Sequence, residues 1–549
     1  MLRRGIDIGE ELMTIVDLSA GDERNRRQET LLAQWSLYSG IASVYADQSD
    51  IENELTIQQQ KLQIATQLED SDLEFVSLFS IARAYKQLSR YPEALEVLKK
   101  QLEIVKGDVA LKTEVSMFMA SIYDTVGRYP EAIATYKHAL NVFKSEGNLR
   151  GEITVLNNLG VIYENLREYA QALENLNQAL ELNHHLRTQH QESIGIVRRL
   201  SDRNNEANRL GNMSLIYADQ GDYAQAQKLK RQALEIYQDT GIQAGVANSS
   251  NDIGSIYQDQ GQYPQALENL EQALKLAREL GLKPLEVTIL SNLGNVYSAQ
   301  GQFEQAEEFY TTSLELSREL GLKSKEATAL VNLGHLRGDQ GHYEQALQTY
   351  QQSLAIRRDI GDVAGESTSL TNLGFTYEQL GDYAAATTAF QQALEIQQQI
   401  GVRSKEGLTL NGLALAYAGQ GNYTEALDLQ QKSLALHREL GDRPNEAKVL
   451  SDMGRLFADQ DQPELAIVFL KASVNLTETL RGELQSLSTE DQASFTESVS
   501  DRYRRLADLL LQQDRVMEAQ RVLDLLKVQD WMIICGGCAA TPIPRPGRS

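Results

Sequence analysis

The stretch NLGNVYSAQGQFEQA, residues 292–306, returns twice, as NLGHLRGDQGHYEQA from Asn332 and as NLGFTYEQLGDYAAA from Asn372. Successive copies lie forty residues apart, and repetition at such a period indicates a stacked array of small units. We count about eleven units in the 549-residue chain, and a degenerate one around Ala507 and Ala519. One aromatic position marks the repeat register, with small changes of spacing in the upstream units. Arg337 and Phe457 occupy this position in two units. In the others it is a tyrosine: Tyr45, Tyr85, Tyr123, Tyr163, Tyr217, Tyr257, Tyr297, Tyr377 and Tyr417.

Each unit is predicted to form two helices. In the unit from Glu286 to Gly321, apolar residues recur at helical spacing on both sides of a break at Gly301, namely Leu290, Leu293 and Val296 before it and Ala306, Tyr310, Leu314 and Leu316 after it. Glycines follow the second helices, where we expect left-handed C-terminal caps: Gly281, Gly321, Gly361, Gly401 and Gly441. Glutamates open the next first helices, at the positive end of the helix dipole: Glu286, Glu326, Glu366, Glu406 and Glu446.

Small residues recur where the two helices of a unit must cross closely. They are Gly254, Gly294, Gly334 and Gly374 in the first helices, and Ala266, Ala306, Ala346 and Ala386 in the second helices. A bulky side chain there would push the pair apart. Because one hairpin cannot bury both of its faces, the hairpins are expected to stack on one another.

These features resemble the tetratricopeptide repeat (TPR). Leu293, Gly294, Tyr297, Ala306 and Ser313 match its Leu-Gly, Tyr, Ala and Ala/Ser positions. The usual unit is 34 residues, and the longer unit here is similar to that of kinesin light chains and related peptide-binding adaptors. The resemblance implies an all-α fold, a right-handed α-α superhelix of about 11–12 helix-turn-helix repeats whose first helices line a concave groove. We expect the solenoid to span residues 35–480, after an N-terminal helical cap at 1–34.

One unit is longer than the others. Tyr163 and Tyr217 are separated by fourteen residues more than the period, and the extra sequence lies near HHLRTQHQESIGIVRRLSD. We expect an extended hairpin near residues 184–203, because the segment has helix formers and no proline. A disordered loop is the alternative.

Composition narrows the classes of partner. The formal net charge is −24, so nucleic acid would be repelled and a basic protein or peptide attracted. No run approaches the roughly 18 apolar residues that span a bilayer, and acids interrupt the N-terminal segment where a signal peptide would be apolar. We expect a cytoplasmic protein without membrane partners.

Polar residues at a four-three-four spacing form one stripe along the first helices. An amide offers both a donor and an acceptor, so a ladder of amides can hold the backbone of an extended peptide. The alternative is that each asparagine bonds the neighbouring helix and sets repeat stacking. The candidate partner-binding residues are Asn158, Asn212, Asp252, Asn292, Asn295, Asn332, His335, Asn372 and Phe375, of which His335 and Phe375 break the pattern and are the better candidates for specificity.

Other kinds of site are disfavoured. A carboxylate clamp needs flanking cations, but Ser291 and Ala299 stand beside Asn295 in the stripe. Acidic residues at one shared position make the expected groove mouth acidic, or are simply solvated helix ends: Asp219, Asp259, Asp339 and Asp459. The histidines at 184, 185 and 190 do not share a helical face, and no phosphate loop, serine elbow or zincin motif occurs. We predict no cofactor, no metal and no catalysis.

Beyond the repeats, residues 481–529 resemble the connector that joins TPR arrays to a C-terminal CHAT domain in a family of bacterial proteins. The resembling residues are Tyr503-Arg504-Arg505-Leu506-Ala507 and Glu518-Ala519-Gln520-Arg521-Val522-Leu523-Asp524-Leu525-Leu526-Lys527. CHAT domains are caspase-like peptidases with a His–Cys pair, which this chain lacks.

The sequence departs from that resemblance at Asp530. Tryptophan and methionine each have one codon, so only one nucleotide sequence encodes Trp531-Met532. When the reading frame is shifted to begin at the third base of the Asp530 codon, this stretch encodes Leu-Asp-Asp, which continues the family pattern. We therefore expect residues 530–549 to be a disordered, out-of-frame tail. The tail contains Cys535 and Cys538, whose C-x-x-C spacing alternatively predicts a zinc or redox site.

The sequence thus predicts a non-catalytic protein- or peptide-binding scaffold, the recognition arm of a truncated CHAT-type protein. The alternatives are a peptide-responsive regulatory or signalling TPR protein, similar to bacterial aspartate-phosphatase regulators, or the regulatory part of a CHAT peptidase.

Overall fold

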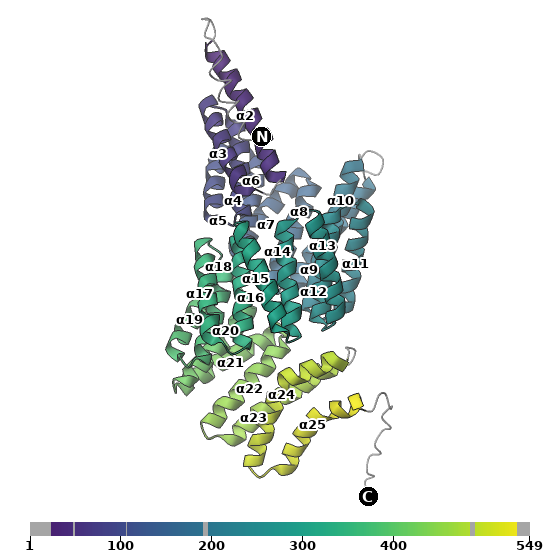
Figure 1. Cartoon of the computed structure of the whole chain (residues 1–549), viewed down its shortest axis with the longest axis vertical. Helices are drawn as coiled ribbons and strands as arrows, with labels where there is room; N and C mark the ends of the chain where they lie inside the picture. The colour runs from purple at the N-terminus through teal and green to yellow at the C-terminus, as the bar shows by residue number, and fades with distance from the viewer. Residues whose placement is uncertain (1–22, 48–49, 106, 190–195, 484–488, 535–549) are drawn as a thin grey trace. The chain divides into compact units, whose positions relative to one another are not determined.

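The computed structural model describes residues 23–47, 50–105, 107–189, 196–483 and 489–534. These residues form 24 helices, α2–α25, and no strand (Figure 1). The helices pair in chain order, α2 with α3 through α24 with α25, so the 24 helices make 12 hairpins. The expected all-α solenoid of about 11–12 helical hairpins is confirmed.

The chain divides into two compact units. The first comprises Met1–Ile256, Ala266–Thr376 and Glu395–Gly401, and the second comprises Tyr257–Gln265, Tyr377–Leu394 and Val402–Ser549.

The helices up to α13 are α2 Glu23–Asp47, α3 Ile51–Leu68, α4 Ser71–Gln87, α5 Tyr91–Ile104, α6 Val109–Thr125, α7 Tyr129–Glu146, α8 Leu149–Asn165, α9 Tyr169–Gln189, α10 Ile196–Asp219, α11 Tyr223–Thr240, α12 Gln243–Asp259 and α13 Tyr263–Glu279. Those that follow are α14 Lys283–Ala299, α15 Phe303–Glu319, α16 Lys323–Asp339, α17 Tyr343–Asp359, α18 Val363–Gln379, α19 Tyr383–Ile400, α20 Arg403–Gly419, α21 Tyr423–Leu440, α22 Arg443–Asp459, α23 Pro463–Glu483, α24 Thr489–Gln512 and α25 Val516–Ile534.

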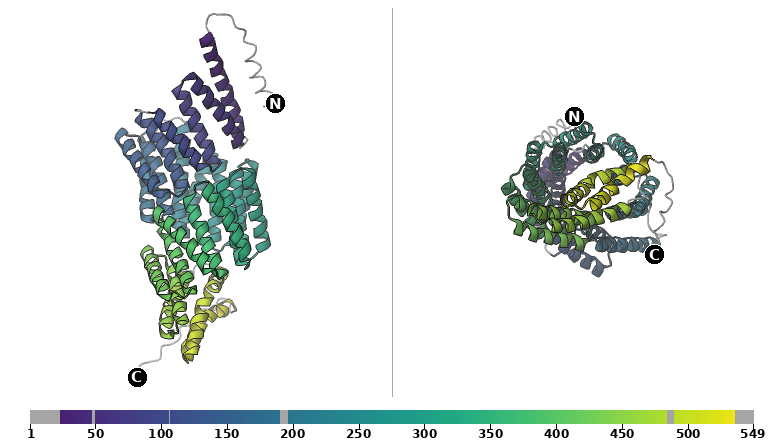
Figure 2. Two further views of the ribbon diagram at one scale, coloured as in Figure 1. Left: turned by 90° about the vertical axis from the view of Figure 1, so that its left-hand side faces the viewer. Right: turned by 90° about the horizontal axis from the view of Figure 1, so that it is seen from below.

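Small residues at the helix crossings make the hairpins close-packed. A Cβ atom built on Gly294 of α14 would lie 2.5 Å from the Tyr310 ring of α15, and one on Gly334 would lie 2.5 Å from the Tyr350 ring. Ala306 and Ala346, in the second helices, are 0% exposed. The helices from α14 to α17 consequently lie side by side (Figures 1 and 2).

The loops between hairpins have the predicted glycine caps. Gly281, Gly321, Gly361, Gly401 and Gly441 have φ values of 67°, 66°, 70°, 76° and 67°, which only glycine adopts at low cost. Four of these loops are also crossed by an ion pair, in which an arginine of the second helix binds the glutamate that opens the next first helix: Arg278–Glu286, Arg318–Glu326, Arg358–Glu366 and Arg438–Glu446.

Helices α9 and α10 are longer than their counterparts. They have 21 and 24 residues, whereas α12 to α18 each have 17. Residues 184–189 and 196–203 of the expected extended hairpin are therefore helical, and residues 190–195 between them lie outside the described residues.

The two ends of the chain differ from expectation. Helix α2 runs without a break across the boundary expected at residue 35 and pairs with α3. Helix α25 continues to Ile534, because the apolar residues 531–534 extend its helical sequence before the glycines at 536 and 537. Residues 530–534 are thus helical rather than disordered, and residues 535–549, with both cysteines, lie outside the described residues.

Within the first unit the chain returns to its own earlier repeats. The backbone amides of Val363 and Ala364 both donate to the carbonyl oxygen of Val126, at 2.9 and 3.3 Å. The amide of Ser324 donates to Oγ of Ser89 at 3.3 Å. The side chain of Ile360 joins the apolar core that contains Val126, together with Ala82, Tyr91, Leu98 and Ile122. Loops far apart in the sequence, 235 residues in the case of Ser89 and Ser324, are therefore in direct contact.

In the second unit, the last hairpin packs on α23. Tyr503 of α24 is 0% exposed and belongs to a core with Leu470, Val474, Leu506 and Leu510, and its hydroxyl donates to Glu478 at 2.5 Å. Lys471 of α23 forms an ion pair with Glu518 of α25 at 2.5 Å. The residues of the expected connector thus continue the stack of hairpins.

Candidate functional site

The first-helix stripe contains hydrogen bonds between consecutive repeats. Nδ2 of Asn292 donates to Oδ1 of Asn251 at 2.9 Å and lies 3.3 Å from Oγ of Ser255. Nδ2 of Asn212 donates to Oδ1 of Asn157 at 3.2 Å. These contacts join neighbouring first helices, α12 with α14 and α8 with α10.

Other stripe residues bind neighbouring second helices. Nδ2 of Asn158 donates to the hydroxyl of Tyr136 at 3.1 Å, and the hydroxyl of Tyr310 donates to Oδ1 of Asn295 at 2.7 Å. Asp252 forms an ion pair with Lys230 of α11. These side chains are held in place by the repeat architecture itself.

His335 connects two repeats. Its Nδ1 lies 3.1 Å from the hydroxyl of Tyr350, and its Nε2 lies 3.4 Å from Nδ2 of Asn372. Desolvation by the surrounding protein lowers the pKa of His335, and the nearby carboxylate of Asp339 opposes this shift. The imidazole is therefore neutral at pH 7.

Asn332 differs from the other asparagines of the stripe. It is half-buried on α16 and forms no hydrogen bond with another residue in the described part of the chain. Phe375 is also half-buried. Asn332 is thus the stripe residue whose side-chain amide is available to a bound partner.

A cluster of carboxylates lies at the ends of three successive first helices. Asp124 is in the last turn of α6, Glu164 in that of α8, and Asp219 ends α10. Burial raises the pKa of Asp124 to about 6, against the opposing charge of Lys86, and Oδ1 of Asp124 is buried without a hydrogen-bond partner among the described groups. Burial, followed by the charges of Asp219 and Asp124, raises the pKa of Glu164 to about 7. Lys86 and Arg167 only partly offset these shifts, and helix C-termini already carry partial negative charge, so a further cation would favour the ionised form of the cluster.

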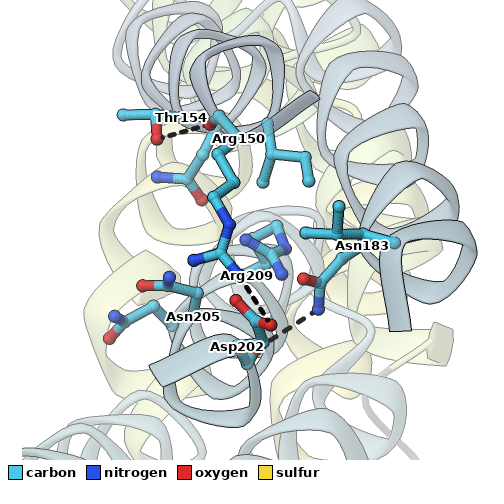
Figure 3. A pocket seen from close by; sticks show the side chains of 10 residues that line it. Arg150, Thr154, Asn183, Asp202, Asn205 and Arg209 are labelled. Carbon is cyan, nitrogen blue, oxygen red and sulfur yellow. Dashed lines mark hydrogen bonds and ion pairs between the residues drawn. The ribbon is translucent and has the colours of Figure 1, made fainter. Parts of the chain in front are cut away.

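A polar cavity of about 140 Å³ lies between α8, α9 and α10 (Figure 3). Arg150, on α8, donates to the buried carboxylate of Asp202 at 3.2 Å, and Nδ2 of Asn183, on α9, donates to the backbone oxygen of Asp202 at 3.3 Å. Arg209 of α10 points into the same space, and the residue is 2% exposed. Its Nε and Nη2 atoms have no hydrogen-bond partner among the described groups.

Sequence models of one repeat family match most of this chain. The tetratricopeptide repeat matches residues 113–183, 245–319, 325–399 and 406–479, and two further models of the same repeat match residues 77–108 and 207–240. The chain belongs to the tetratricopeptide repeat family. The TPR matches cover most of the first helices that carry the stripe residues.

Several solved structures are similar to this TPR protein, with none of the curated proteins matching it. The crystal structure of BtubC from P. vanneervenii is 23% identical, covers 41% of this chain and 89% of its own, and has a TM-score of 0.33. The apo form of RapI is 19% identical over 53% of this chain and 99% of its own, with a TM-score of 0.41. A Rap protein complexed with competence and sporulation factor is 15% identical over 75% of this chain and 99% of its own, with a TM-score of 0.44.

Sequence reasoning missed three residues of this TPR chain. Asp124 and Glu164 follow the repeated tyrosine directly, and this adjacency was the available signal. Arg209 could have been found by aligning the forty-residue register, since the equivalent positions hold small or apolar residues.

No metal site or membrane span is apparent in what the structure describes. The described residues contain no group of three His, Cys, Asp or Glu side chains able to hold a metal ion; His190 and both cysteines are outside them. Among the same residues, no helix combines the length and the apolar character needed to cross a bilayer.

Proposed function

We propose that this TPR protein is a non-catalytic cytoplasmic scaffold that binds a basic protein or peptide along the stripe of its first helices. The observation that carries the proposal is the carboxylate cluster of Asp124, Glu164 and Asp219. An arginine or lysine of a partner would add positive charge beside these carboxylates, on which Lys86 and Arg167 already act.

The stripe supports the same proposal. Most of its amides are fixed by neighbours, which preorganises the surface, whereas the amide of Asn332 is available. A preorganised surface loses less conformational entropy when a peptide binds. The peptide backbone would hydrogen-bond to Asn332, and His335 and Phe375 would select side chains.

A pull-down with the full chain as bait tests the proposal. Partner recovery should fall in Asp124→Asn/Glu164→Gln and in Asn332→Ala. The matched control is Glu315→Gln/Glu319→Gln, which removes the same charge from exposed positions on α15. Equal loss in the control would show that net charge alone attracts the partner. Unchanged recovery in both Asp124→Asn/Glu164→Gln and Asn332→Ala would refute the proposal.

A second candidate rests on the resemblance of residues 503–507 and 518–527 to the connector of CHAT-domain proteins. We propose on this basis that the chain acts as the recognition arm or regulatory part of a CHAT-type peptidase, and not as a free-standing peptide-responsive regulator. Co-purification of the chain with a CHAT-domain protein from its source cells tests this. Recovery of partners without any CHAT domain would favour the free-standing regulator.

A further inference from the structure

Helix α23 carries large apolar side chains at two surface positions where the preceding second helices have none. Leu465 and Val468 of α23 are 45% and 60% exposed. Their equivalents in α13, α15, α17, α19 and α21 are Gln265, Gln305, Gln345, Ala385 and Glu425 at the first position, and Glu268, Glu308, Gln348, Thr388 and Asp428 at the second. The exposed side of the second helices is thus kept free of large apolar residues until α23.

The apolar surface continues onto the last hairpin (Figure 1). In the first turn of α25, Val516 and Met517 are 57% and 71% exposed, and Leu511, near the end of α24, is 45% exposed. With Leu465 and Val468, these residues form what we call the C-terminal patch. They are five of the fourteen large apolar side chains that are exposed in the described part of the chain. A single exposed leucine needs no explanation, but a group of them on one surface indicates an interaction site.

Two ion pairs show that the α23 and α25 parts of the patch are neighbours. Nη1 of Arg515 lies 3.3 Å from Oε2 of Glu464, and Nζ of Lys471 lies 2.5 Å from Oε2 of Glu518. On α23, Val468 is four residues after Glu464 and three before Lys471, so the three side chains share one helix face. The exposed apolar residues of α25 lie between Arg515 and Glu518 in the sequence. The first turns of α23 and α25 therefore present one continuous surface.

The charges within the patch cancel. Its ion pairs contain two cations and two carboxylates, and Arg515 also binds Glu518 at 2.8 Å. Only at the edge, in the loops before α23 and α25, are two further carboxylates exposed, those of Asp461 and Asp514. The whole chain has a formal net charge of −24, so two copies repel each other over most of their surfaces. A second copy can approach most readily where the surface is apolar and locally neutral.

The patch also has the form that a twofold contact requires. Helix α23 contributes Leu465 and Val468, and α25 contributes Val516 and Met517. A twofold axis near the ion pairs would place each of these halves on the other half of a second copy. Such self-complementarity is the condition for an isologous interface.

We infer that the C-terminal patch is the interface of a symmetric dimer of this chain. Leu465 and Val468 of one copy would pack against Val516 and Met517 of the other. This goes beyond the proposed function and does not depend on it, because the patch is centred on second helices and the stripe lies on first helices. A standard interface buries about 800 Å² of each partner, which is more than five partly exposed side chains supply. We therefore expect a weak dimer that dissociates on dilution.

Sedimentation velocity of the full chain over a hundredfold range of concentration tests the inference. The chain should sediment as one copy of 61.3 kDa when dilute and as two copies when concentrated. Leu465→Gln/Val468→Glu should weaken this association at least tenfold. The variant should fold like the parent, because it introduces the residues that α13 and α15 have at the same positions.

Two further variants exclude trivial causes. Val109→Glu places the same charge at a 56% exposed valine of α6 and should change association by less than twofold. Met517→Gln adds no charge and alters the other half of the patch. It should weaken association at least threefold, which repulsion between added charges would not explain.

Salt distinguishes apolar contact from pairing of charges between the copies. Added NaCl should strengthen the association, because it screens the repulsion between two acidic chains and leaves the apolar contact in place. Association that salt weakens would overturn the inference, since ion pairs between the copies would then hold the dimer.

The other results that would overturn it concern the patch itself. A full chain that stays monomeric at every concentration would mean that another part of the chain or a different protein covers the patch. Association that either patch variant leaves unchanged, or that Val109→Glu weakens equally, would place the contact elsewhere.

Discussion

The side-chain amide of Asn292 donates to the side-chain oxygen of Asn251, 2.9 Å away on the first helix of the preceding repeat. The equivalent residue one repeat later, Asn332, has no such bond in the described part of the chain. Two asparagines in identical register thus have different roles. One joins repeats, and the other presents its amide to the surface.

Asn292→Ala should therefore destabilise the protein, because it removes two hydrogen bonds and leaves the buried amide of Asn251 without its donor. We expect a loss of about 1–2 kcal/mol in the free energy of unfolding. Asn332→Ala is the matched control and should change stability by less than about 0.5 kcal/mol. Denaturant unfolding measures both; equal losses would contradict the assignment.

The carboxylate cluster predicts an unusual pH dependence. In the folded protein the pKa values of Asp124 and Glu164 are raised to about 6 and about 7 from 3.8 and 4.5. A raised carboxyl pKa means that the folded state binds the proton more tightly, so this contribution to stability is present at low pH and is lost as the pH rises through 6 to 7. Glu164→Gln should increase stability at pH 8 by on the order of 1–2 kcal/mol and have little effect at pH 4. A variant that is no more stable than the parent at pH 8 would show that the cluster is not strained.

Alanine substitutions at two glycines of first helices distinguish the cost of overpacking from the gain in helix propensity. Gly294→Ala places a Cβ 2.5 Å from the Tyr310 ring and should cost about 1–3 kcal/mol through overpacking. Gly338→Ala, on α16, meets nothing within 4 Å and should be stabilising by roughly 0.5–1 kcal/mol, because alanine restricts the unfolded chain. Thermal unfolding of the two variants checks the opposite signs.

The contact between distant loops can be tested in the same way. Gly127 and Gly221 hold equivalent loop positions with φ values of 78° and 79°, so alanine at either pays the same backbone cost of about 1 kcal/mol. A Cβ on Gly127 would lie 2.3 Å from Cβ of Ala364, whereas one on Gly221 meets nothing within 4 Å. Gly127→Ala should therefore lose about 1–2 kcal/mol more than Gly221→Ala. Equal losses would mean that the loops are not in contact in solution.

The features that repeat were predictable from the sequence, because each is imposed locally on every hairpin. The glycine caps from Gly281 to Gly441 and the crossing at Gly294 and Ala306 follow from helix geometry and a fixed period. The contact of Val126 with Val363 was not predictable, because it depends on the small rotation between repeats summed over many of them. The cavity at Arg209 was missed for a different reason, since it lies where the repeat is irregular and a single substitution decides the chemistry.

The hydrogen bonds from Val363 and Ala364 to Val126 also bear on how the protein folds. An open solenoid can unfold from any end, because each repeat touches only its neighbours. Here, a contact that spans every hairpin from α8 to α17 can form only after all of them are in place. It raises the contact order of an otherwise local fold, and it should make the repeats of the first unit melt together and not one by one.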